Sequence, residues 1–341
     1  MHPLAFFYPV GHAGHAQPGH AERPERVETI RRVLEVAGLW DQALQIQPEI
    51  IPGPVLAAIH TPGMLETARI NSQHETNIDL DTYLTQSSWP LALTAAGGTA
   101  ALARAVWRGE AQAGFALARP PGHHATRSHS MGFCLLNNIA LAAEILLQQE
   151  GAQRLAIVDM DVHHGNGTQD IFYERGEVMF ISSHQVPLYP GSGQLNERGL
   201  GKGFGKIVNL PLPPQSGNRA FAMAYQEIIP SLLTRFQPEM VLVSFGFDSH
   251  WKDPLANLLV SARAYGEAVQ SLRTWAQANC QGRIALVLEG GYDLEAAGAC
   301  ALAAAQGMLA EKISDDLGPS RQRESDDWVK VLERVKQIWE L

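Results

Sequence analysis

The 341-residue sequence has only three cysteines, Cys134, Cys280 and Cys300, which are odd in number and widely spaced. This pattern argues against a disulfide framework and against a zinc site made of cysteine thiolates. The first twelve residues also lack the basic segment and the small-residue cleavage site of a secretory signal. We therefore expect a reducing, cytoplasmic location.

Two further absences restrict the partners of the protein. No apolar run reaches the roughly 18–20 residues that a helix needs to cross a bilayer, so we expect no membrane contact. The net charge is −9, and lysine and arginine form no cluster. Direct nucleic-acid binding is therefore not expected, whereas an acidic chain favours a small cationic substrate.

Short apolar runs are abundant, in a chain with 45% hydrophobic and 18% charged residues. The runs do not alternate with polar residues, which is typical of strands buried on both faces of a parallel sheet. Helical patterns lie between them, and this succession predicts an α/β fold of three layers, α/β/α, with a central, mostly parallel sheet. Without an internal repeat or a Ser/Gly linker, we expect one domain over residues 1–341. The expected strands span residues 4–10, 113–118, 154–161, 178–184, 206–212, 240–248 and 283–292.

Two helical segments have individual features. Pro230 lies inside the helical pattern of residues 219–236 and predicts a kink there. Near the C-terminus, about residues 325–341, the pattern predicts an amphipathic helix with one apolar stripe. This stripe either packs on its own domain or forms a contact in a homo-oligomer. It consists of Trp328, Val331, Leu332, Val335, Ile338 and Trp339.

Titratable side chains follow four of the apolar runs. In parallel α/β sheets, ligands bind beyond the carboxyl ends of the strands, so these side chains are expected to converge at one edge of the sheet. They are His123 and His124 after the run 113–118, Asp159, Asp161, His163 and His164 in and after 154–161, Asp248 in 240–248, and Tyr292 in 283–292.

Three of these side chains are candidate metal ligands. Asp161 and His163 are two residues apart and can share one side of the chain, and Asp248 is a third ligand. Three protein ligands leave one position open, which is the pattern of catalytic zinc. The same donors also suit Fe²⁺ or Co²⁺. The alternative is that Asp161 is a capping or loop carboxylate.

The other side chains have roles around such a metal. His123 and His124 are candidates for general acid–base catalysis, and Asp159 could fix the tautomer of one of them. Tyr292 could donate to a carbonyl oxygen that gains negative charge; the alternative is a core tyrosine. Phe133 and Tyr189 could form the walls of an apolar slot.

Six motifs resemble, in order and over residues 10–310, the zinc-dependent deacetylase branch of the arginase–deacetylase superfamily. The details are similar to class II histone deacetylases and to bacterial histone-deacetylase-like and acetylpolyamine amidohydrolases. The resemblance implies the arginase–deacetylase fold. The motifs are "GHAERPERV", "PPGHH", "MGFCLLNN", "DMDVHHGNGTQD", "GFDSHWKDPL" and "LEGGYDL".

The resemblance also implies a role for each matching residue. One zinc ion would bind to Asp161, His163 and Asp248. His123 and His124 would be the tandem general base and acid, Asp159 would support His123, Asn166 would lie behind the second histidine, and Tyr292 would polarise the carbonyl. The remaining positions are Phe133, Tyr189, Gly132, Gly290 and Leu255 around the substrate, Asp79 or Asp81 at the rim, and Arg26 in an acetate-exit pocket. Structural K⁺ or Na⁺ ions would sit on the backbone at Asp159, Asp161, His163 and Ser182, and near Phe172 and Val178.

The resulting hypothesis is a metal-dependent amidohydrolase that removes the acyl group from an acylated amine, above all Nε-acetyl-lysine. Acetylpolyamine deacetylation is the alternative reaction, and a catalytically silent acyl-lysine-binding module is the alternative class. The binuclear chemistry of the other superfamily branch is disfavoured, because Gly165 and His250 stand where its second metal needs carboxylates.

Overall fold

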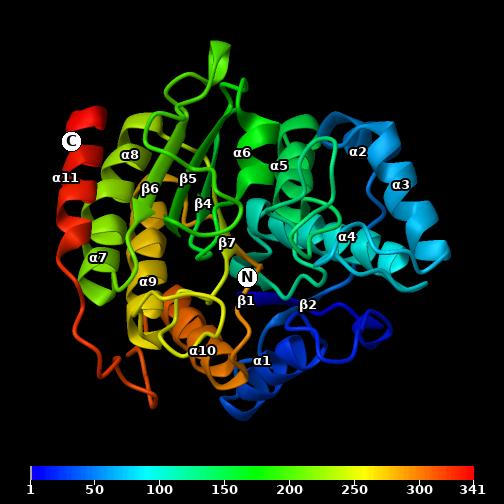
Figure 1. Cartoon of the computed structure of the whole chain (residues 1–341), viewed down its shortest axis with the longest axis horizontal. Coiled ribbons are helices and arrows are strands. Elements are labelled where there is room, and N and C mark those ends of the chain that lie inside the picture. The colour runs from blue at the N-terminus through cyan, green and yellow to red at the C-terminus, as the bar shows by residue number, and fades with distance from the viewer. Residues whose placement is uncertain (1) are drawn as a thin grey trace.

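Eight strands form one parallel sheet at the centre of the computed structural model, which describes residues 2–341 (Figure 1). The strand order is β2-β1-β3-β8-β7-β4-β5-β6, and all neighbouring strands run parallel. The predicted α/β fold is therefore confirmed. The strands are β1 (His2–Phe7), β2 (Leu44–Ile46), β3 (Ala111–Ala116), β4 (Leu155–Asp159), β5 (Val178–Gln185), β6 (Ile207–Leu212), β7 (Val241–Phe245) and β8 (Ile284–Leu288).

The strands that lead to the candidate site are shorter than the sequence predicts. The runs 154–161, 240–248 and 283–292 end as strands at Asp159, Phe245 and Leu288. One residue beyond β4 and β8 the amides of Met160 and Glu289 still donate to carbonyls of β7. The following amides bond to carboxylates: that of Asp161 to Asp159 Oδ1, that of Val162 to Asp248 Oδ1, and that of Gly290 to Asp161 Oδ2. Apolarity alone does not reveal this change of partner. The three-residue edge strand β2 was not predicted.

Helices cover both faces of the sheet (Figure 1). One face is covered by α1 and α7 to α11, which pack on the first apolar core. The other face is covered by α2 to α6, which pack on the second core. Along β1, Leu4 and Phe6 point into the first core and Ala5 and Phe7 into the second, as expected for strands buried on both faces. The helices are α1 (Glu25–Val36), α2 (Gly53–Ile59), α3 (Pro62–Gln73), α4 (Ser88–Trp107), α5 (Asn138–Gln149), α6 (Asn166–Phe172), α7 (Asn218–Met223), α8 (Ile229–Phe236), α9 (Ala262–Asn279), α10 (Leu294–Leu309) and α11 (Asp327–Trp339).

The helical segment that contains Pro230 is interrupted just before the proline. A π-helical turn, Ala224–Ile228, separates α7 from α8, and Pro230 occupies the first turn of α8. Proline cannot donate a backbone hydrogen bond to the preceding turn, so the regular helix is broken at that turn.

The C-terminal helix α11 packs on its own chain. Trp328, Leu332, Val335 and Trp339 are buried in the first core, and Arg235 donates to the carbonyl oxygens of Trp339 and Glu340 at its end. The apolar stripe is thus used within the chain.

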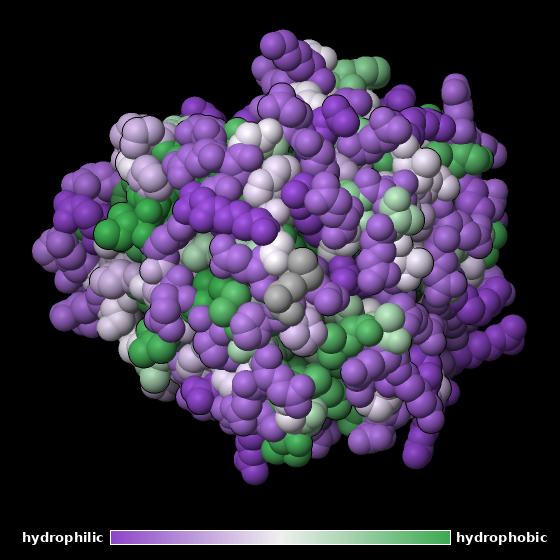
Figure 2. Space-filling view, turned by 180° about the vertical axis from the view of Figure 1, so that it is seen from behind, coloured by the Kyte–Doolittle hydropathy of each residue, from purple (hydrophilic) through white to green (hydrophobic). Residues whose placement is uncertain are grey.

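The face of the molecule in Figure 2 is mainly hydrophilic with scattered apolar areas. No helix between residues 2 and 341 has the length and apolar character of a membrane span.

Candidate active site

The titratable residues converge beyond the four central strands of the sheet. β3, β8, β7 and β4 are consecutive neighbours, so the loops that follow them meet at one edge. The loop after β3 carries His123 and His124, the loops after β4 and β7 carry the three candidate metal ligands, and the turn after β8 carries the phenol of Tyr292. This is the expected ligand position of an open parallel sheet.

Asp161, His163 and Asp248 come together as one cluster. Their donor atoms all lie within 4.8 Å of one another. Nδ1 of His163 is 3.2 Å from Asp161 Oδ1 and 3.1 Å from Asp248 Oδ2. Both carboxylates are fully buried, and each also accepts a backbone amide. The cluster is therefore held in place by the surrounding loops.

The charges of this cluster fit a divalent cation. Among residues 2–341, neither Asp161 nor Asp248 pairs with a lysine or arginine; their ion-pair partners are the imidazoles of His163 and, for Asp161, His123. Burial together with the charge of Asp161 raises the pKa of Asp248 to about 7. Burial opposes the charge of His163, but the two carboxylates outweigh it and raise its pKa to about 10. Two buried carboxylates without a fixed cation suit a metal ion, which would replace the proton of His163.

His123 and His124 lie side by side but have different partners. Their ring centroids are 4.0 Å apart. Nδ1 of His123 bonds to the carboxylate of Asp159 at 3.0 Å, and Nδ1 of His124 to the amide oxygen of Asn166 at 2.7 Å. Burial disfavours both charges. The carboxylates of Asp161 and Asp159 nevertheless raise the pKa of His123 to about 10, whereas burial and the two neighbouring imidazoles hold the pKa of His124 well below its usual value.

Tyr292 lies across the cluster in the turn after β8. Its side chain is nearly buried, with the guanidinium of Arg26 at 4.9 Å from its ring centroid and the ring of Phe133 edge-on at 5.7 Å. Burial raises the pKa of the phenol well above its usual value, so it is a donor at neutral pH. Gly290, two residues earlier, has no room for a side chain, because a Cβ there would overlap the carboxylates of Asp248 and Asp161.

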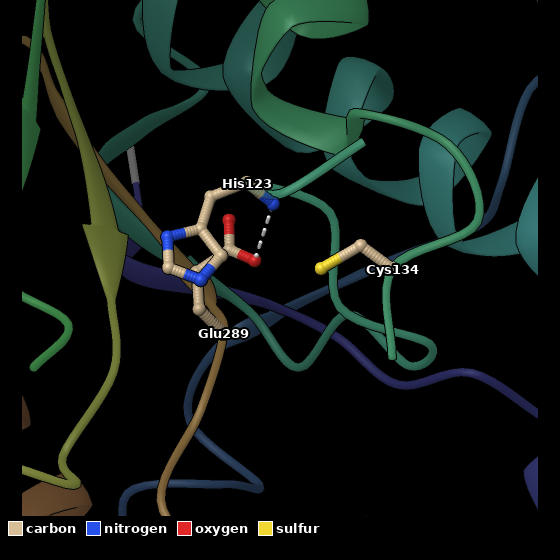
Figure 3. Close-up of side chains that lie close together, drawn as sticks. All are labelled: His123, Cys134 and Glu289. Atoms are coloured by element: carbon tan, nitrogen blue, oxygen red, sulfur yellow. Dashed lines mark hydrogen bonds between the residues drawn. The ribbon is translucent and has the colours of Figure 1, made fainter. Parts of the chain in front are cut away.

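Glu289 follows β8 directly and lies close to His123 and Cys134 (Figure 3). Its carboxylate accepts the backbone amides of Gly122 at 2.7 Å and His123 at 3.0 Å, and the hydroxyl of Ser244 at 3.0 Å. Burial raises its pKa to about 7. The potential donors of His123, Cys134 and Glu289 are close enough to bind a metal, but the oxygens of Glu289 are already bonded, so we assign this group to holding the histidine loop.

Two of the residues expected around the substrate, Tyr189 and Leu255, are more than a third exposed. Tyr189 is 42 % exposed and its ring is edge-on to His124 at 5.2 Å. Gly132 adopts a φ of 56°, and a Cβ there would press on His124 and Tyr189. Leu255 is 37 % exposed. Gly132 and Tyr189 therefore lie against His124, while Leu255 is joined to the turn of Tyr292 through Asp253.

The remaining predicted positions lie around this centre. Asp81 is exposed, and its carbonyl accepts a hydrogen bond from His20; the carboxylate of Asp79 instead accepts the amides of residues 81 and 82. Arg26 is buried and donates to the carbonyls of Glu289 and Gly291. For the monovalent cations, Asp159 and Ser182 are paired in the β4–β5 ladder, and Phe172 and Val178 are buried at the end of α6 and the start of β5. Both cation positions stay predictions.

Sequence reasoning missed three buried acids that hold the site together. Glu289 supports the histidine loop, Asp253 accepts the amide of Tyr292, and Glu22 pairs with Arg119 and Arg26. Asp253 and Glu289 occur within motifs next to apolar runs, where an unpaired carboxylate is costly. Their position beside apolar runs was the sequence feature from which Asp253 and Glu289 could have been predicted.

Comparison with known proteins finds relatives that cover most of the chain. Residues 20–308 match the family model described as "Histone deacetylase domain". The chain is 40 % identical over 282 residues to a probable deacetylase of Archaeoglobus fulgidus, covering 82 % of this chain and 78 % of that protein. It is 35 % identical over 307 residues to a histone deacetylase-like amidohydrolase of Pseudomonas aeruginosa, covering 88 % and 80 %. The crystal structure of the HDA15 HD domain superposes with a TM-score of 0.89 at 34 % identity, covering 98 % of this chain and 94 % of that one.

Proposed function

Because the chain belongs to the histone deacetylase family, we propose that it hydrolyses Nε-acetyl-lysine or a related acyl-lysine with one zinc ion per chain. A single observation carries this proposal. A buried cluster of two carboxylates and an imidazole lies beside two histidines with different partners, and this arrangement would support hydrolysis of an amide.

Asp161, His163 and Asp248 would hold the metal through two oxygens and one nitrogen. A divalent ion bound there would act as a Lewis acid on the substrate carbonyl and would lower the pKa of water. The amides of His163, Val162 and Gly290 fix the carboxylates in this arrangement, so the ligand set is preorganised by the loops.

The histidines divide the proton transfers through their partners. Asn166 Oδ1 is an acceptor, so Nδ1 of His124 carries its hydrogen and Nε2 is free to accept a proton from water. The carboxylate of Asp159 stabilises a charged His123, and His123 then donates a proton to the leaving amine. Tyr292 donates to the oxygen that becomes negative when water adds.

The rim favours acyl-lysine over acetylpolyamine. Leu255, which the resemblance places around the substrate, is 37 % exposed and offers no charge to the distal ammonium of a polyamine. The exposed acids Asp79 and Asp81 lie near Tyr189, where their charges add to the rise in its pKa that burial causes. They could hold a cationic flank of either substrate, so acetylpolyamine deacetylation stays the second candidate.

Chelation tests this function directly. Turnover of a fluorogenic acetyl-lysine substrate should disappear when metal is stripped and return when zinc is added, since the two buried carboxylates then regain their cation. Metal analysis should find one ion per chain. Activity that needs two ions would contradict the single-metal site. A metal-loaded protein that binds acetyl-lysine but hydrolyses neither it nor acetylputrescine would be a silent binding module.

A further inference from the structure

A buried carboxylate outside the predicted site holds the turn that carries Tyr292. Asp253 is 6 % exposed and lies in the loop that follows Asp248. Its Oδ2 accepts the backbone amides of Tyr292 at 2.6 Å and Asp293 at 3.4 Å. Its Oδ1 accepts the amide of Leu255 at 3.0 Å. One carboxylate therefore joins the loop after β7 to the turn after β8.

The turn itself has little stiffness of its own. Two glycines precede Tyr292, and Gly291 has a φ of 111° that side-chain-bearing residues rarely adopt. A Cβ at Gly291 would also overlap the ring of Phe247. Because the backbone is permissive here, the position of Tyr292 depends on the groups that hold it from outside.

The phenol is not fixed by a hydrogen bond of its own. Arg26 and Phe133 contact the ring, and within residues 2–341 the hydroxyl has no side-chain hydrogen-bond partner. An oxyanion donor has to lie about 2.7–3.1 Å from the developing charge, and a displacement of about 1 Å can cost a factor on the order of 10² in rate. The backbone position of Tyr292 thus matters for the reaction.

We propose that Asp253 is a positioning residue, whose carboxylate holds the backbone of Tyr292 so that the phenol faces the reacting carbonyl. The inference rests on the proposed role of Tyr292. Asp253 acts through backbone amides, so it influences the transition state and leaves binding of the substrate largely unchanged. Asp253 also accepts the amide of Leu255, so the same carboxylate holds Tyr292 and this predicted substrate-binding residue.

The test compares Asp253→Asn, Tyr292→Phe and the double variant in turnover of the fluorogenic acetyl-lysine substrate by zinc-loaded protein. The asparagine side chain has one acceptor oxygen and one NH₂ donor. Either the amides of Tyr292 and Asp293 or the amide of Leu255 would then face the NH₂ group and lose their acceptor. We expect kcat to fall at least about tenfold with KM and zinc content nearly unchanged. In the Tyr292→Phe background, Asp253→Asn should have almost no further effect on kcat, because the donor it positions is already absent.

Asp315→Asn is the matched control. The Asp315 carboxylate also accepts two backbone amides, that of Arg263 in the first turn of α9 and that of Gly318, and the kcat of this variant should stay at the wild-type value. Should Asp253→Asn not fold, Asp253→Ser, which retains one acceptor on a smaller side chain, allows the same double-variant comparison.

The outcomes separate the two hypotheses. A wild-type kcat for the Asp253 variant, or effects of the two substitutions that multiply fully in the double variant, would overturn the positioning role. If Tyr292→Phe alone keeps full activity, the proposed role of Tyr292 is wrong, and the inference falls with it.

Discussion

At the scale of single residues, the partners of His123 and His124 explain why two adjacent imidazoles can serve different steps. A carboxylate partner stabilises the charged form of an imidazole, and an amide oxygen fixes a neutral tautomer. Asp159 and Asn166 supply these two partners. At a single pH, His123 can therefore hold a proton while His124 is free to accept one.

Tyr292 gives the clearest prediction for one side chain. Tyr292→Phe removes only the hydroxyl, and we expect turnover to fall by a factor on the order of 10²–10³, the usual cost of losing one oxyanion donor. Zinc content should be unchanged, because the proposed metal ligands are Asp161, His163 and Asp248. An unchanged rate would show that the tyrosine is structural.

Leu255 gives the prediction for substrate choice. We expect kcat/KM to be higher for an acetyl-lysine peptide than for acetylputrescine, and Leu255→Glu should shift that ratio toward acetylputrescine, because a carboxylate attracts its second ammonium. A tenfold shift corresponds to about 1.4 kcal/mol of transition-state binding. A ratio above about ten in favour of acetylputrescine in the unmodified chain would contradict the acyl-lysine assignment.

At the scale of elements, the end of β8 organises the loops of its neighbours. The carboxylate of Glu289 bonds to the loop after β3 and to Ser244 of β7, while the amide of Gly290 bonds to Asp161 after β4. The histidine loop and the metal ligands are thus aligned through one short segment.

Glu289 allows a matched pair of variants. Glu289→Ala leaves the buried amides of Gly122 and His123 without an acceptor, at about 1–3 kcal/mol each, and we expect loss of both stability and kcat. Glu289→Gln retains an oxygen for these amides, and Ser244 can accept from the new NH₂ group, so most activity should remain. Thermal unfolding and steady-state kinetics measure both effects. Equal losses in the two variants would show that the charge of Glu289 is required.

At the scale of the whole molecule, a buried ion-pair network joins distant parts of the chain. Glu22 pairs with Arg119 at 2.7 Å and with Arg26 at 3.2 Å, and all three side chains are fully buried. Arg119 also donates to the carbonyls of His12 and His15. The network fixes the N-terminal loop against the loop after β3 and, through Arg26, against the turn that carries Tyr292.

Glu22→Gln should destabilise the fold by about 3–5 kcal/mol, because it leaves buried arginines without their carboxylate. Burial opposes the charge of Glu22, but Arg119, His15 and Arg26 outweigh it and lower its pKa below the ordinary 4.5. This contribution to stability is complete above pH 4.5 and is lost as the pH falls through the folded-state pKa. We measure the free energy of unfolding with denaturant at pH 7 and at a pH below 4.5. The difference between the two values should be smaller for Glu22→Gln than for the unmodified chain. Glu66→Gln, in an exposed pair with Arg69, is the control and should change little; an equal effect of both would refute the network.

The fold class and the residue types of the candidate site could be predicted from the order of the residues. Non-alternating apolar runs predict a buried parallel sheet because burial on both faces imposes that composition. Charged side chains at the ends of those runs are costly unless they are paired or bind metal. Asp161, His163 and Asp248 could therefore be singled out although they are up to 87 positions apart, since carboxyl ends of parallel strands meet at one edge.

Only the tertiary structure decided which groups hold the site in place. The strand ends, the supports Asp253 and Glu289, and the use of the α11 stripe within the chain all depend on contacts between segments far apart in sequence. Periodicity and apolarity describe how each segment is buried, but they contain no information on which backbone amide a carboxylate meets. That choice follows from the packing of the loops in three dimensions.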